Sequence, residues 1–267
     1  MAKEKTTKKR KKKKKKYRKL FVSTAAFIMA AVVIIFCIYY VYFETPYFDI
    51  AGIHVSGNNY YNKEYIIEQS QVKVGQKLFS IDREKIKDTL EDEIYVEKAR
   101  VVYEIPNNIL IELTEREEKY QVLYNNQYII TDKSGLVLKT DSVKNELLTI
   151  ESLTDVLYNV GESIQITGIE NNDTIFKTVE YINSEFGDDT VKSLSIDYKN
   201  SILIETEYGT YIRIVLNEDI KYQIVFAMKI INERLNNNLT VTNSLIDFTK
   251  GDSPVYIEDF KMEEYNE

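Results

Sequence analysis

The sequence predicts an α+β protein with an N-terminal transmembrane helix, a small β-α-α-β-β domain and a larger mixed β domain with two flanking helices. Three observations support this prediction. A stretch of 24 uncharged residues lies close to the N-terminus. After it, strand-like alternation and helical spacing follow one another in the order β, α, α, β, β. The last and longest block is rich in alternating segments and contains two segments of helical periodicity.

Charge divides the chain into two very different parts. Residues 1–19 contain thirteen Lys or Arg residues and one acidic residue, Glu4, whereas residues 20–267 contain 22 basic and 41 acidic residues. Such asymmetry indicates a membrane, nucleic-acid or partner role for the basic tail. No aromatic or helical pattern interrupts the lysines between Lys8 and Lys16. We therefore favour a tail that orients a membrane helix and contacts anionic lipid over specific nucleic-acid binding.

Residues 20–43 are predicted to form the transmembrane helix. At ~1.5 Å per residue this helix reaches ~36 Å, which spans a hydrocarbon core of roughly 30 Å with some tilt. Aromatic residues crowd its distal end, and the basic residues 1–19 lie at the other, which predicts a cytoplasmic tail and an extracytoplasmic remainder. A cleaved signal peptide is the competing interpretation. Its apolar core is usually about 7–15 residues long and ends in a small-x-small site, and no such site is visible here.

Cysteine and histidine are too few for a metal site. Cys37 is the only cysteine and lies inside the predicted membrane helix, so we expect no disulfide outside it. Structural zinc needs about four Cys or His ligands, and Cys37 with the single histidine, His54, cannot supply them. We predict no metal and no cofactor.

The first block after the membrane helix, residues 46–117, is predicted to be one small domain. Asn62 precedes a short first helix, Gly75 ends that segment, and Asp82 caps a second helix. Two strands joined by Pro106-Asn107-Asn108 follow, and with the helices on one side they make a small sandwich. The predicted strands are Ile50–Ser56, Val96–Ile105 and Ile109–Glu115.

The second block, residues 118–258, is predicted to be strand-rich, and an acidic tail of residues 259–267 follows it. One helix begins near Asp173 and another near Ile220, and both carry apolar residues at i, i+4, i+7 and i+11 that we interpret as core. The predicted strands are Tyr120–Tyr124, Tyr128–Asp132, Leu136–Lys139, Val191–Asp197, Ile202–Glu207, Thr210–Leu216, Leu245–Phe248 and Pro254–Ile257.

A search for catalytic motifs yields no candidate catalytic residue. Ser70-Gln71-Val72-Lys73 matches the Ser-x-x-Lys of penicillin-binding enzymes, but Ser56-Gly57-Asn58, which resembles their second motif, precedes it, and no Lys-Thr-Gly follows. His54 has no apparent nucleophile to activate. The carboxylates around Glu117 sit beside basic residues and are typical of a self-paired surface.

Beyond these patterns, the chain resembles the bacterial division proteins of the FtsQ/DivIB family. The residues of the first block that resemble that family's POTRA domain are Phe48, Ile50, Ile53, Val55, Gly57-Asn58, Gly75-Gln76, Leu78-Phe79, Ile86, Leu90, Val96, Ala99, Val101, Pro106, Leu110 and Glu115-Arg116. The run Tyr128-Ile129-Ile130-Thr131-Asp132 with Gly135 resembles the start of the family's β domain, and Ile246-Asp247 and Val255-Tyr256 resemble its end. The lysine-rich tail, the single anchor and the domain order fit the DivIB branch. The family often has proline soon after the Glu-Arg pair, at the hinge between the domains. Here Glu117-Glu118-Lys119 follow instead, so the resemblance does not extend to the hinge.

The resemblance implies a non-enzymatic division protein at the septum, which binds FtsL and FtsB/DivIC-like membrane proteins outside the membrane and helps position septal peptidoglycan synthesis. The last predicted strand could offer a sheet edge to such a partner, because Pro254 donates no N–H to a ladder. The expected partner-binding residues are Lys250, Pro254, Val255, Tyr256 and Ile257, with Tyr256 as the anchor. The alternative interpretation, that surrounding charges block this edge, remains open. So do two other functions: a membrane-anchored cell-wall enzyme or its regulator, and a POTRA-bearing secretion component.

Overall fold

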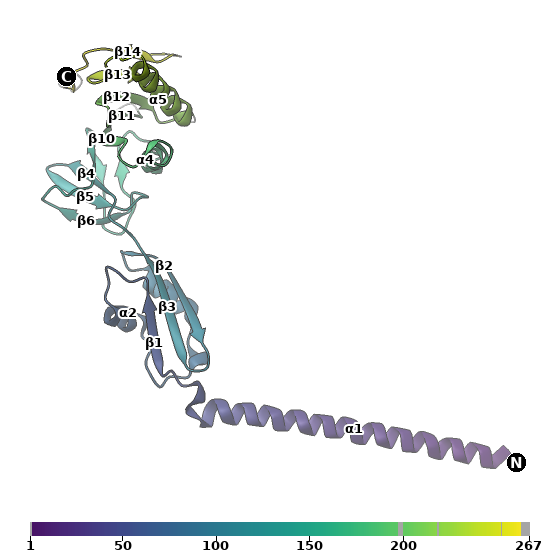
Figure 1. Ribbon diagram of the computed structural model, residues 1–267. Helices are drawn as coiled ribbons and strands as arrows, with labels where there is room; N and C mark the ends of the chain where they lie inside the picture. The colour runs from purple at the N-terminus through teal and green to yellow at the C-terminus, as the bar shows by residue number, and fades with distance from the viewer. Residues whose placement is uncertain (1, 197–199, 218, 252, 263–267) are drawn as a thin grey trace. The chain divides into compact units, whose positions relative to one another are not determined.

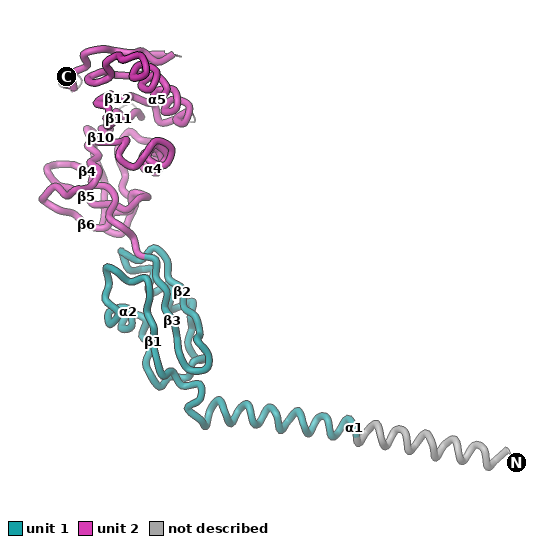
Figure 2. The backbone as a smooth tube through the Cα atoms, viewed as in Figure 1, with its two compact units in different colours: residues 1–114 teal, residues 115–267 magenta. Residues whose placement is uncertain are grey.

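A computed structural model describes residues 2–196, 200–217, 219–251 and 253–262, with the side chains of residues 2–22 left undescribed. The side chains of the predicted basic tail, residues 1–19, therefore lie outside the described residues, as do residues 263–267 of the predicted acidic tail. The chain forms two compact units, Met1–Thr114 and Glu115–Glu267 (Figure 2).

Unit 1 begins with the long helix α1, Ala2–Glu44 (Figure 1). Its segment Ser23–Glu44 is long and apolar enough to cross a membrane, and none of it is buried inside the protein. Cys37 is exposed on this segment. An apolar helix that satisfies its own backbone while exposing apolar side chains is the structure that lipid requires, so among the described residues the structure has one helix suited to span a membrane, near the N-terminus.

The rest of unit 1 is the expected β-α-α-β-β fold. After the short helix η1 (Pro46–Phe48) come β1 (Gly52–Ser56), α2 (Lys63–Ser70), η2 (Leu78–Ser80), α3 (Arg83–Glu91), β2 (Val96–Glu104) and β3 (Asn108–Glu115). The Asn62 side chain accepts from the Tyr65 amide and the Asp82 side chain from the Lys85 amide, so both predicted caps start their helices.

The sheet of unit 1 has the order β1-β3-β2, with β1 parallel to β3. Strand β1 starts at Gly52, two residues later than predicted. The Ile50 amide donates to the Gln76 carbonyl at 2.8 Å and the Ala51 amide to the Asn107 carbonyl at 2.7 Å, so these backbone groups are used outside the β1 ladder. The core lies between sheet and helices and contains Ile66, Leu78, Leu90, Val96, Ile109 and Ile111, all fully buried.

Unit 2 is built on one nine-stranded sheet in the order β14-β13-β12-β11-β10-β7-β4-β5-β6. Its strands are β4 (Tyr120–Tyr124), β5 (Gln127–Thr131), β6 (Val137–Asp141), β7 (Leu148–Ser152), β10 (Val191–Ile196), β11 (Ser201–Thr206), β12 (Thr210–Val215), β13 (Ser244–Asp247) and β14 (Val255–Ile257). Helices α4 (Asp173–Phe186) and α5 (Ile220–Asn236) cover one face (Figure 1). Strands β8 (Val156–Leu157) and β9 (Gln165–Ile166) form a separate hairpin.

Strand β7 was not predicted, although it lies inside this sheet between β4 and β10. It pairs in parallel with β4 on one side and with β10 on the other. The buried Gln121 holds the chain at its entrance, because its amide nitrogen donates to the carbonyls of Asn145 and Leu147 at 2.9 and 2.8 Å and lies 3.0 Å from the Thr149 hydroxyl. Strand β7 therefore joins strands β4–β6 and strands β10–β14 into one sheet.

The start of unit 2 is fixed by a buried carboxylate. One Asp132 oxygen accepts from the Ser134 amide, the Ser134 hydroxyl and the Leu136 amide at 2.8, 2.7 and 3.0 Å. The other accepts from the Arg116 guanidinium at 2.8 Å, with the Asp132 side chain only 4% exposed. Gly135, between these donors, has φ +84°, and a Cβ there would lie 2.2 Å from the Phe176 ring. The turn between β5 and β6 is therefore joined to Arg116, at the start of unit 2, by an ion pair and packs closely against Phe176 of α4.

Candidate protein-binding edge

The end of the large sheet carries the residues that the sequence analysis assigned to partner binding. Strand β14 pairs antiparallel with β13, with Leu245 opposite Ile257, Ile246 opposite Tyr256 and Asp247 opposite Val255. No strand of the described chain follows β14 in the sheet order. Among the described residues, β14 is therefore the edge strand at this end of the sheet.

The side chains of β14 alternate between solvent and the protein's own core. Val255 and Ile257 are 42% and 36% exposed. Tyr256 packs against the core, with the Arg234 guanidinium of α5 lying 4.0 Å from its ring centroid and its hydroxyl donating to the Thr240 carbonyl at 3.4 Å. The exposed apolar surface of this edge is thus formed by Val255 and Ile257, while Tyr256 attaches the strand to unit 2.

The connection between β13 and β14 begins with a fixed turn. The buried Asp247 carboxylate accepts from the Thr249 amide at 2.8 Å and from the Thr249 hydroxyl at 2.6 Å. Lys250 follows in an exposed bend, and Pro254 is half-buried immediately before β14. The structure therefore places Lys250 on the connecting loop and Pro254, Val255, Tyr256 and Ile257 together at the edge.

Sequence reasoning missed Arg234 of α5, the side chain that packs against Tyr256 of β14. Arg234 contacts the Tyr256 ring, donates to the Thr240 carbonyl at 3.2 Å and pairs with Glu258 at 2.7 Å. Its signal was its position three residues after the core residue Ile231 in a predicted helix, which places both on neighbouring parts of one face.

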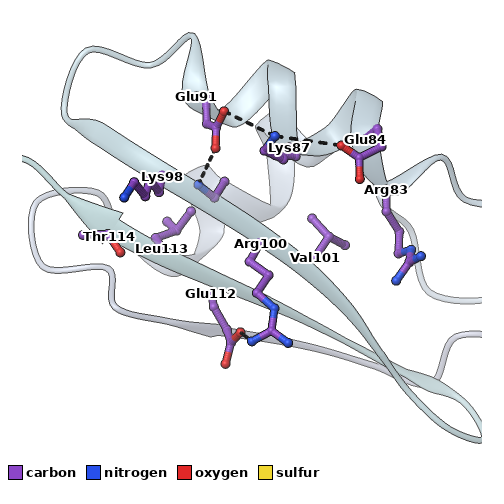
Figure 3. Close-up of a pocket in the computed structure, with 11 residues that line it drawn as sticks. Arg83, Glu84, Lys87, Glu91, Lys98, Arg100, Val101, Glu112, Leu113 and Thr114 are labelled. Atoms are coloured by element: carbon purple, nitrogen blue, oxygen red, sulfur yellow. Dashed lines mark hydrogen bonds and ion pairs between the residues drawn. The ribbon is translucent and has the colours of Figure 1, made fainter.

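Two other sheet edges are covered by the protein's own groups. At β2, the Glu91 carboxylate of α3 accepts from the Ala99 amide at 3.0 Å (Figure 3). At β6, the Val137 amide donates to the Glu162 carbonyl at 2.9 Å and its carbonyl accepts from the Gly161 amide at 2.8 Å. Covering an edge with side chains or loops is how proteins prevent unwanted strand addition.

Strand β1 is also at an edge, but its pattern differs from that of β14. Its apolar residues Ile53 and Val55 pack against the core of unit 1, whereas His54 and Ser56 are exposed. His54 Nδ1 lies 2.7 Å from Glu104 Oε2, with the two side chains 55% and 38% exposed. The side chains that β1 offers to solvent are therefore polar, unlike Val255 and Ile257 of β14.

A pocket of about 620 Å³ lies beside β2 in unit 1 (Figure 3). Charged side chains of both signs line it. Lys87 lies 3.9 Å from both Glu84 and Glu91, and Arg100 donates to Glu112 at 3.0 Å. In these ion pairs opposite charges neutralise one another, as expected for a solvated surface. The lining residues include no nucleophile positioned beside a base.

Comparison with known proteins gives the following similarities. Residues 48–116 match the FtsQ-type POTRA domain. The chain is 26% identical over 179 residues to the cell division protein DivIB of Clostridium tetani, covering 66% of each chain. It is 27% identical over 206 residues to DivIB of Clostridium acetobutylicum, covering 72% of this chain and 79% of that one. It is 30% identical over 97 residues to the cell division protein FtsQ of Syntrophotalea carbinolica, covering 36% and 34% of the two chains.

Proposed function

Because the chain belongs to the FtsQ/DivIB family of cell division proteins, we propose that it is a non-enzymatic assembly protein of the division machinery. Its partners are FtsL and FtsB/DivIC-like membrane proteins, and its role is to help assemble septal peptidoglycan synthesis. The observation that carries this proposal is the outer edge of β14, where backbone groups and two exposed aliphatic side chains, Val255 and Ile257, lie side by side.

The proposed orientation places residues 1–19 in the cytoplasm and both folded parts outside. It rests on the excess of Lys and Arg before the membrane-spanning segment. Protease added to intact cells stripped of their wall should then digest the chain beyond Glu44 and spare the basic tail. Protection of the β14 region in that assay would contradict this orientation.

Strand addition at β14 supplies both affinity and selectivity. A partner segment in an extended conformation forms main-chain hydrogen bonds with the outer side of β14, while alternate side chains meet Val255 and Ile257. Tyr256 contributes by holding the strand against α5.

The binding test uses the full chain in detergent or nanodiscs and a purified FtsB/DivIC-like partner. The double substitution Val255→Asp with Ile257→Asp places two charges where the partner's apolar side chains dock. We expect at least a tenfold rise in Kd, equivalent to about 1.4 kcal/mol. Truncation after Gly251 removes β14 and should abolish binding. Tyr256→Ala should also weaken it, because the substitution removes the ring that holds β14 against Arg234 of α5.

Leu157→Asp is the matched control, because Leu157 is an aliphatic strand residue of the same unit and is 65% exposed. Circular dichroism should confirm that every variant is folded. Unchanged affinity after the truncation would place the partner site elsewhere. Turnover of peptidoglycan or its precursors by the purified chain, abolished by one substitution, would favour the enzyme alternative.

A further inference from the structure

The segment after α1 is held against the loop that connects α2 with α3. Asp49 and Lys77 form an antiparallel bridge, and the Gly75 amide donates to the Ile50 carbonyl at 2.8 Å. The Lys77 ammonium donates to the Thr45 carbonyl at 3.0 Å and pairs with the Asp49 carboxylate at 2.5 Å. The loop of residues 72–81, which we call the foot loop, therefore lies next to the end of the membrane helix.

Aromatic rings continue this contact from the helix into the folded domain. The Tyr42 ring, in the last turn of α1, lies 6.1 Å from the Phe79 ring. Phe79 in turn lies 5.4 Å from Phe48 and 5.4 Å from Tyr103. Although it has these neighbours, the Phe79 residue remains 46% exposed.

The position of Tyr42 fixes the depth of this cluster relative to a bilayer. Tyr42 lies at the end of the membrane-spanning segment Ser23–Glu44, where aromatic side chains reside at the boundary between acyl chains and headgroups. A ring 6.1 Å from Tyr42 lies at a similar depth. Val74, at a turn in the same loop, is 67% exposed, and Tyr47 is 57% exposed. Phe79 is thus partly exposed at the level of the membrane surface, and Val74 is an exposed apolar side chain of the same loop.

Basic residues outnumber acidic ones in the foot loop and the first turn of α3. Between residues 72 and 85 the chain has four basic residues, Lys73, Lys77, Arg83 and Lys85, and two acidic ones. The Arg83 guanidinium lies 4.5 Å from the Tyr103 ring centroid, beside Phe79. Apolar side chains with a basic border are the pattern of surfaces that rest in the lipid interface, where the basic groups meet headgroup phosphates.

We propose that the foot loop is a membrane-docking surface that inserts Phe79 and Val74 into the interface of the same bilayer that α1 crosses. The occupant of this apolar surface is lipid, because the surface continues directly from the end of the membrane helix. Docking at two points, α1 and the foot loop, holds the small domain at a fixed height and orientation on the membrane.

Single tryptophans can test this arrangement, because the chain contains no natural tryptophan. The full chain is reconstituted into vesicles of phosphatidylcholine and phosphatidylglycerol, with or without bromine atoms on the acyl chains near the headgroup. Phe79→Trp and Val74→Trp report on the foot loop, Tyr42→Trp is the reference within the span, and Tyr222→Trp on α5, at a site 61% exposed, is the comparison outside it.

We expect brominated lipid to quench Phe79→Trp and Val74→Trp nearly as strongly as Tyr42→Trp, with a blue-shifted emission in vesicles, and to leave Tyr222→Trp unchanged. Val74→Trp is decisive, because among the described contacts this side chain has none with α1. If Val74→Trp and Phe79→Trp are instead quenched by aqueous iodide and not by brominated lipid, or no more by lipid than Tyr222→Trp, the proposal is wrong.

Discussion

Removing the Asp132 carboxylate should destabilise unit 2 more than any neighbouring surface change. The carboxylate accepts four hydrogen bonds, from Ser134, Leu136 and Arg116, and is 4% exposed. Hydrogen bonds to a charged group contribute about 1.5–3 kcal/mol each, but they are not additive, because freed donors can regain water. We therefore expect Asp132→Ala to lower the free energy of unfolding by about 3–5 kcal/mol, the range for breaking a buried ion pair.

Removing its basic partner should cost less. Arg116 is 20% exposed, and in Arg116→Ala the carboxylate keeps its three donors from Ser134 and Leu136. The expected loss is about 1.5–3 kcal/mol, the contribution of one charged hydrogen bond. Chemical denaturation of residues 46–267 measures both variants, and hydrogen exchange at the Ser134 and Leu136 amides assigns the effect to unit 2, since two units need not unfold together.

The same carboxylate predicts a dependence on pH. Burial by itself raises the pKa of Asp132, but hydrogen bonds from the Ser134 hydroxyl, the Leu136 and Ser134 amides and Arg116 together lower it below its usual value. A lowered pKa in the folded state stabilises the protein above the unfolded value of about 3.9, and that stabilisation is lost as pH falls through the folded value. The difference between the wild type and Asp132→Asn should therefore shrink below about pH 4.

The control is Asp141→Ala, because Asp141, at the end of β6, accepts a similar bond from the Val143 amide but is only partly buried. It should leave the denaturation midpoint of unit 2 nearly unchanged. If Asp132→Ala unfolds at the wild-type denaturant concentration and its Ser134 and Leu136 amides stay protected, the assignment of Asp132 as a structural centre is refuted.

Three further outcomes are expected. Gly135→Ala should destabilise unit 2, by about 1–2 kcal/mol for the left-handed backbone and about 1–3 kcal/mol for displacing Phe176, measured by denaturation against the wild type. Burial raises the pKa of Tyr61 from about 10 to about 12, so the folded unit 1 retains this proton longer and loses stability between pH 10 and 12; Tyr61→Phe should remove that loss in alkaline denaturation curves. Residues 46–117 should fold alone as a marginally stable domain, and collapsed amide dispersion in its NMR spectrum would contradict this boundary.

Local patterns predicted most of the fold because the local signals and the packing agree. Asn62 and Asp82 are helix caps both in the sequence pattern and in the structure, and the apolar stripe through Ile175 and Ile182 of α4 is buried. The Asn125-Asn126 turn has positive φ at both residues, as a tight hairpin between twisted strands requires. These elements depend on neighbours in sequence.

Long-range pairing limited the rest of the prediction. Strand β7 has only two apolar residues, Leu148 and Ile150, and its position follows from pairing with β4 and β10 and from the buried side chain of Gln121. A five-residue pattern cannot show such partners. At the β14 edge, alternation indicated the two faces of the strand. It did not reveal that Arg234, distant in sequence, covers Tyr256.

The order of strands along the chain has a consequence for when the β14 edge exists. Strand β14 follows the eight other strands of its sheet in sequence, and it pairs with β13, which itself pairs with β12. During synthesis and export the earlier parts of a chain fold first. A chain that still lacks residues 255–257 ends its sheet at β13 and presents a different edge. Assembly through β14 would therefore distinguish finished molecules from unfinished ones, so that completion of the sheet acts as a checkpoint on recruitment.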